Sequence, residues 1–128
     1  MERQVMEETT HRSLEGTMTF GEVVMKLMAA GVESYYVDLV RMEKTYYMPD
    51  GQSYRESFNY RGNAPAADFS ADEVVKAIRA SQKGKIKYVE FLDRVLSAGT
   101  TQYGVFIDGK KAVYTGRKGD SHVEHFPK

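Results

Sequence analysis

The chain contains an internal repeat, and this repeat constrains the fold more than any other feature of the sequence. Residues 20–58 align with residues 88–126 at a constant offset of 68 and without gaps. Ten aligned positions are identical: Glu22/Glu90, Ala30/Ala98, Gly31/Gly99, Tyr35/Tyr103, Val37/Val105, Tyr46/Tyr114, Gly51/Gly119, Ser53/Ser121, Glu56/Glu124 and Phe58/Phe126. Because a repeated sequence folds into a repeated supersecondary unit, we expect two copies of one unit related by a pseudo-two-fold axis.

Each copy begins with an amphipathic helix. Large apolar residues recur at i, i+3, i+4, i+7 and i+8, a spacing that places them on one helical face. They are Phe20, Val23, Val24, Leu27 and Met28 in the first copy, and Tyr88, Phe91, Leu92, Val95 and Leu96 in the second. A glycine, Gly31 or Gly99, follows each helix and can take the left-handed conformation that ends a helix without steric cost.

After each glycine the apolar period changes from 3.6 to 2, which is typical of strands. One face of the first strand carries Tyr35, Val37 and Leu39, and its repeat carries Tyr103, Val105 and Ile107. Asp108-Gly109 predicts a hairpin turn, whereas the matching turn after Val40 is inferred from the repeat alone. Turns at 49–51 and 117–119 lead to third strands at 52–58 and 120–126. Each copy is therefore predicted to be a helix followed by a three-stranded antiparallel meander.

Two further helices complete an α+β architecture. Residues 70–73, Ser-Ala-Asp-Glu, form a capping box that opens a connecting helix of about 71–83, and residues 19–22 form a similar box. Residues 2–15 are compatible with a polar N-terminal helix. At 128 residues the chain is predicted to be a single domain, 1–128, with repeat halves of about 19–58 and 87–126.

Composition narrows the class of protein. There is no cysteine, no apolar run long enough to span a bilayer and no secretory signal, so we expect a cytoplasmic protein without membrane contact. The net charge is zero, but residues 1–68 carry 7 basic and 11 acidic residues and residues 69–128 carry 11 and 7. The halves therefore differ by sign, −4 against +4, which is compatible with contacts between two copies and equally with charges spread over solvated faces.

Several segments give the sequence a family resemblance. They are the run from Thr19 to Val24, Ala-Gly-Val-Glu at 30–33, Lys-Thr-Tyr-Tyr at 44–47 and His-Val-Glu-His-Phe at 122–126. In these segments, and over nearly the whole chain, the sequence resembles the YbcV-like bacterial family, some of whose members carry the label phage envelope protein. The resemblance implies a small bacterial domain and supplies no activity.

Acidic residues and histidines near the third strands are the candidates for catalysis. Glu56 and Glu124 lie at repeat-equivalent positions, so a paired-carboxylate site assisted by His122 would follow if they met at the pseudo-two-fold axis. The alternative is that each carboxylate accepts hydrogen bonds from its neighbours. On a strand, His122 and Glu124 share a face while His125 and Ser121 point to the other, so neither a metal site nor a Ser-His pair is expected.

Tyrosine is the commonest aromatic residue, and the first half contains most of it. Adjacent tyrosines on a strand put one ring on each face, so Tyr36, Tyr47 and Tyr54, together with Arg55, are candidates for a ligand or protein-binding surface. The strand propensity of tyrosine explains the same pattern without a partner.

The sequence contains no recognised nucleotide-binding, metallohydrolase or nucleophile-elbow motif. Basic residues gather only around 76–87, where a solvated helix face explains them, so nucleic-acid binding is not expected. We therefore predict a non-catalytic small-ligand or protein-interaction module, a homodimer without cofactor or metal. A small enzyme that uses the paired carboxylates is the alternative.

Overall fold

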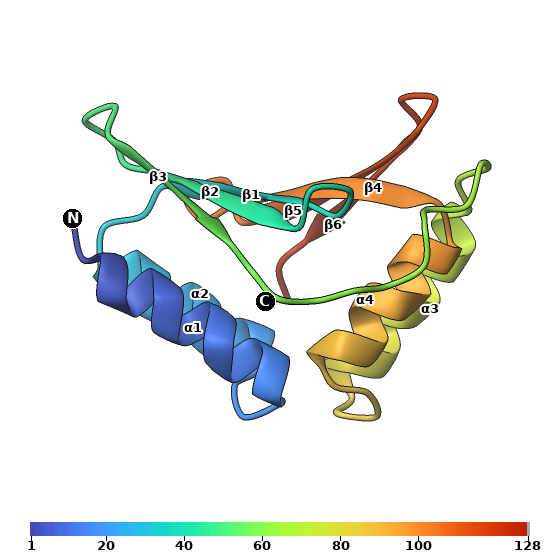
Figure 1. The fold of residues 1–128 in the computed structure, drawn as a ribbon, viewed down its shortest axis with the longest axis horizontal. Helices are drawn as coiled ribbons and strands as arrows, with labels where there is room; N and C mark the ends of the chain where they lie inside the picture. Colours follow the sequence, from blue (N-terminus) through green and yellow to red (C-terminus); the bar gives the residue numbers. More distant parts are fainter. Residues whose placement is uncertain (128) are drawn as a thin grey trace.

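Residues 1–127 of the computed structural model form one six-stranded antiparallel sheet with four helices packed on one of its faces (Figure 1), so the α+β prediction is confirmed. The first half contains α1 (Arg3–Glu15), α2 (Phe20–Ala29), β1 (Ser34–Asp38), β2 (Glu43–Tyr47) and β3 (Ser53–Ser57). The second half contains α3 (Ala71–Gln82), α4 (Tyr88–Ser97), β4 (Thr100–Phe106), β5 (Lys111–Gly116) and β6 (Ser121–His125). Within this part of the chain no helix is long and apolar enough to cross a membrane.

The two halves meet in the middle of the sheet. The strand order is β3-β2-β1-β4-β5-β6, and the antiparallel pair β1–β4 joins the halves. In that pair Tyr36 lies opposite Gly104, the residue 68 positions later. The pseudo-two-fold axis that relates the halves therefore passes through the Tyr36–Gly104 pair, between the helix pairs α1–α2 and α3–α4 that Figure 1 shows beneath the sheet.

The repeat unit is larger than the sequence pattern indicated. The predicted connecting helix is α3, and its start at Ala71 lies 68 residues after the start of α1 at Arg3. Glycines with left-handed backbones follow both helices, with φ 77° at Gly16 and 71° at Gly84. Each unit therefore contains two helices and a meander. The buried residues of α1 are Met6, Thr9, Thr10 and Ser13, and three of these four are small and polar, so α1 lacks the apolar signal that marks the other helices.

The predicted helix ends and turns are largely confirmed. Gly31 and Gly99 have φ of 86° and 94°. The turn inferred from the repeat lies between β1 and β2, where Met42 has φ 55°, close to the 56° of Lys110 in the β4–β5 turn. At α3 the Ser70 hydroxyl accepts a hydrogen bond from the Glu73 N–H at 3.2 Å. The reciprocal half of that predicted capping box is wrong.

The capping box at α3 is incomplete because both groups of its second hydrogen bond, the Ser70 N–H and the Glu73 carboxylate, have other partners. The Ser70 N–H donates instead to the Ala98 carbonyl at 2.8 Å, and the Glu73 carboxylate pairs with Lys76 at 3.1 Å. The box at α2 is complete, because Thr19 and Glu22 bond each other's backbone N–H groups.

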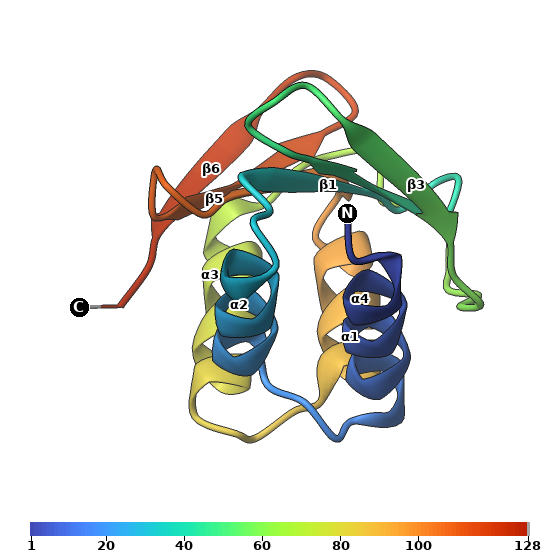
Figure 2. The ribbon, with the colours of Figure 1, turned by 90° about the vertical axis from the view of Figure 1, so that its left-hand side faces the viewer.

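The sheet has two unlike faces. Its inner face, which we define as the face toward the helices, contributes Tyr35, Val37 and Tyr46 from the first half and Tyr103, Val105 and Tyr114 from the second. These side chains are at most 5% exposed and form the core with the apolar stripes of the helices. The outer face has no helix over it among residues 1–127 (Figures 1 and 2).

Candidate functional site

Three aromatic rings lie on the uncovered outer face, and the middle one, Tyr36, contacts the other two. Tyr36 of β1 makes edge-to-face contacts with Tyr47 of β2 and Phe106 of β4, with ring centres 5.7 and 5.8 Å apart. Tyr36 and Tyr47 remain 40% and 39% exposed. These rings place aromatic surface across the middle of the sheet, where it is open to a partner.

Gly104 explains why one tyrosine occupies the centre of this face. A Cβ atom at Gly104 would lie 2.8 Å from the Tyr36 ring, so the ring rests directly on the glycine backbone. Tyr36 and Gly104 are repeat-equivalent residues on neighbouring strands. A side chain at either position would compete for the same space, so the repeat carries a large ring at one position and glycine at the other.

Two valines extend the apolar surface across the second half. Val113 of β5 pairs in register with Gly104 and with Val123 of β6, which is 44% exposed. We define the aromatic face as Tyr36, Tyr47, Phe106, Val113 and Val123. Sequence reasoning found only its two tyrosines. Strand alternation puts Phe106 on the face opposite Tyr103 and Val105, but the side-by-side position of the outward residues depends on the order of the strands.

The predicted ligand-binding residues do not form one set. Arg55 lies on the outer face, in the same cross-strand row as Tyr36 through Thr45. Tyr54 lies on the inner face, where its hydroxyl donates to the Glu7 carboxylate at 2.7 Å and the Arg3 guanidinium lies 5.1 Å from its ring centre. Tyr54 does not belong with Tyr36 and Tyr47, because it pairs in register with the inward-facing Tyr46, and alternation along β3 then places Arg55, and not Tyr54, on the outer face.

Glu56 lies on the inner face of β3, and its Oε1 accepts two short hydrogen bonds. The Tyr46 hydroxyl and the Thr10 hydroxyl each donate to this oxygen at 2.5 Å. Burial, and next the negative charge of Glu56, raise the pKa of Tyr46 well above its usual range. Tyr46 therefore remains a neutral hydrogen-bond donor at physiological pH, and α1 is tied to the first meander through Thr10.

Lys44 lies beside Glu56 and is the one charged side chain of residues 1–127 that is almost fully buried, with 4% exposure. Its Nζ lies 5.3 Å from the Tyr88 ring centre and 5.7 Å from that of Phe58. Within residues 1–127 it makes no hydrogen bond and no ion pair within 4.0 Å. Burial lowers the pKa of Lys44 to about 8, although the charge of Glu56 opposes the shift. Sequence reasoning missed this residue.

A tyrosine pair closes this buried region on the side of α4. The hydroxyls of Tyr88 and Tyr103 are 2.5 Å apart, and burial raises the pKa of both side chains above the usual range. Both phenols are thus protonated near neutral pH. We define the Lys44 cluster as Lys44, Glu56, Tyr46, Thr10 and Tyr88.

Glu124 occupies the equivalent position in the second half but has different neighbours. It bonds Arg79 of α3 at 2.7 Å and the His122 ring at 3.0 Å. Burial disfavours the charged carboxylate, yet the hydrogen bonds from Arg79 and His122 outweigh it and lower the pKa of Glu124. The Arg79 side chain is 48% exposed, so this triad lies at the rim of the helix layer.

The structure does not bring the two predicted catalytic carboxylates together. Glu56 lies on β3 and Glu124 on β6, the two outermost strands of the sheet. The alternative reading required them to meet at the pseudo-two-fold axis, and this condition is not fulfilled, because β1 and β4 occupy that axis. The paired-carboxylate arrangement is therefore not assembled, and each carboxylate has hydrogen-bond partners of its own half.

The histidines behave as strand alternation predicts. His122 faces inward beside Glu124, and His125 lies on the outer face and is exposed. Residues 1–127 contain no group of three or more His, Asp or Glu side chains placed to hold a metal ion.

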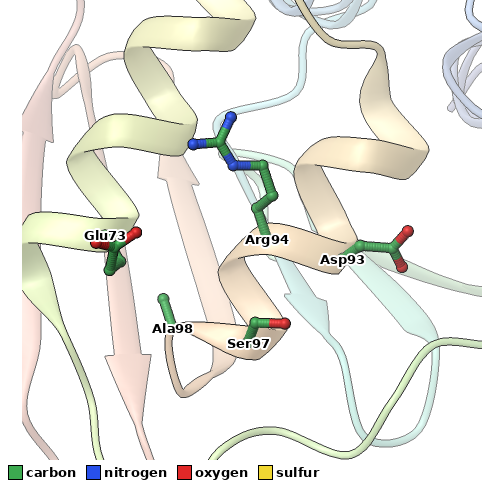
Figure 3. Close-up of a pocket in the computed structure, with 5 residues that line it drawn as sticks. All are labelled: Glu73, Asp93, Arg94, Ser97 and Ala98. Atoms are coloured by element: carbon green, nitrogen blue, oxygen red, sulfur yellow. The ribbon is translucent and has the colours of Figure 1, made fainter.

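Two small pockets lie outside the aromatic face. One, of about 210 Å³, lies between α3 and α4 and is lined by Glu73, Asp93, Arg94, Ser97 and Ala98. Figure 3 shows that Arg94 rises between the helices while Asp93 points away from Glu73. This pocket is lined by two acidic residues and one basic residue, a combination that favours no single class of ligand. The other pocket, of about 390 Å³, is lined by residues 40–42 and 58–62.

Comparison with known proteins found no family model and no curated protein that matches the chain. The resemblance to the YbcV-like family therefore stays a prediction.

Proposed function

We propose that this protein is a non-catalytic protein-interaction module and that the aromatic face is its contact surface. The observation that carries the proposal is the exposure of Tyr36 and Tyr47, rigid aromatic side chains that contact each other on a sheet face with no helix over it. Tyrosine is enriched at contact hot spots because it buries a large area at little cost in side-chain entropy.

A second copy of the chain is the partner that the charges favour. The first half carries a net charge of −4 and the second half +4. Two copies that meet with the first half of one against the second half of the other bring together halves of opposite net charge. The aromatic face lies across both halves, so the same surface serves both copies, as a symmetric dimer requires.

The experiment that tests the proposal is sedimentation velocity over a range of protein concentrations. We expect the wild type to dimerise and the double variant Tyr36→Ser/Tyr47→Ser to sediment as a monomer with unchanged circular dichroism. The matched control is Met25→Gln, which alters an apolar side chain that is 67% exposed on the helix layer. This control should dimerise like the wild type.

Hydroxyl-radical footprinting locates the contact. If Tyr36 and Tyr47 become protected as dimer forms while Met25 does not, the aromatic face is the interface. A wild type that stays monomeric at high concentration would remove the homodimer, and dimerisation that survives the double substitution would place the interface elsewhere.

A further inference from the structure

The pocket lined by residues 40–42 and 58–62 belongs to the first half alone and is separate from the aromatic face. It is open to solvent and has a volume of about 390 Å³, which is within the range of small-molecule sites. One wall is the turn between β1 and β2, and the other is the chain that follows β3.

The turn that forms the first wall is fixed by its own hydrogen bonds. The Asp38 carboxylate accepts hydrogen bonds from the backbone N–H groups of Val40 and Arg41, each at 2.9 Å. The Arg41 Nε donates to the Glu43 carboxylate, also at 2.9 Å. Arg41 is one of the lining residues, and in residues 1–127 the terminal amino groups of its guanidinium have no further hydrogen-bond partner.

The second wall is attached to both layers of the fold. The Phe58 N–H donates to the Met42 carbonyl at 3.0 Å, which joins the two walls. The Tyr60 hydroxyl donates to the Asp93 carboxylate of α4. Because sheet and helix both hold this segment, the pocket exists before any ligand arrives, and binding does not need to order it.

The chemistry of the lining favours an anion with an apolar part. Arg41 and Arg61 are the charged residues of the lining. Arg61 makes no hydrogen bond or ion pair with the residues that the structure describes, so its planar set of donors is available to a carboxylate or phosphate. Val40, Met42 and Phe58 supply apolar surface beside it.

A buried cation behind the pocket is a second, independent observation. Phe58 is one of the lining residues, and the ammonium of Lys44 lies 5.7 Å from the centre of its ring. A positive charge held in a poorly screened environment adds to the attraction for an anion. The carboxylate of the neighbouring Glu56 offsets part of this charge, although no ion pair with Lys44 lies within 4.0 Å among residues 1–127.

The second half does not repeat these features. The residues equivalent to Val40 and Arg41 in the second half are Asp108 and Gly109. The second half therefore has an acidic residue in place of the valine and no side chain in place of the arginine. The pocket chemistry is therefore a property of the first copy, added to a scaffold that both copies share.

We propose that this pocket binds a small organic anion, one carboxylate or phosphate group on an apolar body, with Arg61 as its principal charge partner. Binding at this site is separate from the dimerisation proposed above, because no residue of the aromatic face lines the pocket.

The test is a titration of ¹⁵N-labelled full-length protein followed by NMR. The probes are benzoate, phenyl phosphate and the neutral benzamide, which has the same ring without the charge. We expect saturable shifts of the amides of residues 40–42 and 58–62 with at least one anion, and weaker or no shifts with benzamide. The anion that saturates first identifies carboxylate or phosphate as the preferred group.

Three variants make the result specific. Arg61→Gln should weaken binding of the anion about tenfold or more, because a charge-assisted hydrogen bond is lost. Val40→Asp, which introduces the residue of the second half at a position that is 66% exposed, should also weaken binding. Lys83→Gln removes an equal charge from an exposed position at the end of α3 and should leave binding unchanged.

The proposal would be overturned by shifts that spread over the surface without saturation, by equal binding of benzamide and the anions, or by equal weakening in Arg61→Gln and Lys83→Gln. The spectra themselves report folding, so loss of binding in a variant with an intact spectrum is attributable to the pocket. Sedimentation of Arg61→Gln separates this result from dimerisation, since the variant should associate like the wild type.

Discussion

The two halves of the molecule place a glutamate at the same strand position and surround it with different chemistry. Glu56 accepts hydrogen bonds from the hydroxyls of Tyr46 and Thr10 and lies beside the buried Lys44. Glu124 is held by the half-exposed Arg79 and by His122. The residues equivalent to Lys44 and Thr10 in the second half are Ala112 and Ile78. One repeat backbone therefore supports a buried polar cluster on one side and an ordinary apolar core with a rim ion pair on the other.

The comparison teaches that the repeat conserves geometry and not electrostatics. Turns, helix ends and strand register agree between the halves, because they depend on backbone conformation and on which face is apolar. The charged side chains of the two halves differ because a single substitution changes the charge at a position without changing the backbone. Function in a duplicated fold is then to be sought where the copies disagree: the Lys44 cluster, the pocket beside Phe58, and Tyr36 over Gly104.

The largest expected effect distinguishes the two glutamates. Glu56→Ala removes the acceptor of two buried hydroxyls and the nearest negative charge to Lys44, so we expect a loss of about 3 kcal/mol in the free energy of unfolding. Glu124→Ala should cost about 1 kcal/mol, because its main partner Arg79 is half-exposed and finds water instead. Urea denaturation of both variants measures the difference, and equal losses would contradict the contrast.

The next effect concerns pH and Lys44. The folded pKa of Lys44, about 8, lies below its ordinary value of 10.5. Between these values the unfolded chain binds a proton that the folded chain lacks, so stability rises with pH and this contribution is lost as pH falls through about 8. From pH 7 to 9.5 we expect a gain of about 2 kcal/mol at this residue.

The buried tyrosines limit the pH range over which stability rises. Their folded pKa values are raised above the ordinary 10.0, so they stay protonated in the folded chain while the unfolded chain ionises, and stability falls above about pH 10. Lys44→Met should abolish the gain below pH 9.5 and leave the fall above pH 10. Denaturant unfolding at a series of pH values measures both, and a wild type with no gain would show that Lys44 is not desolvated.

The smallest effect concerns the starts of the two repeat-equivalent helices α2 and α4. Thr19 caps α2 through its hydroxyl, whereas Lys87 at the start of α4 has no side-chain acceptor to offer. Thr19→Ala should cost about 1 kcal/mol, and Lys87→Thr should stabilise by about 0.5–1 kcal/mol. The thermal midpoints of both variants measure these two effects. A lower midpoint for Lys87→Thr would show that the packing of the Lys87 side chain against Gly16 stabilises the fold more than a threonine cap does.

The sequence predicts in part that Lys44 lies on the inner face of the sheet. The repeat placed Tyr46 on the inner face, and strand alternation puts Lys44 on that same face two residues earlier. The aligned Ala112 also indicates a core position. The rings of Tyr88 and Phe58 lie beside the Lys44 ammonium. Tyr88 belongs to α4 of the other half, so no local sequence pattern around Lys44 predicts this contact.

By itself the sequence determined the period of each element, the glycines that end the helices and the offset that relates the two copies, because these follow from local sterics and from apolar spacing. Only the tertiary structure decided that β1 pairs with β4. That pairing sends Glu56 and Glu124 to opposite edges and brings Tyr36 onto Gly104. Strand order depends on contacts between residues far apart in the chain, which compete by small free-energy differences, and a repeat pattern is compatible with more than one such order.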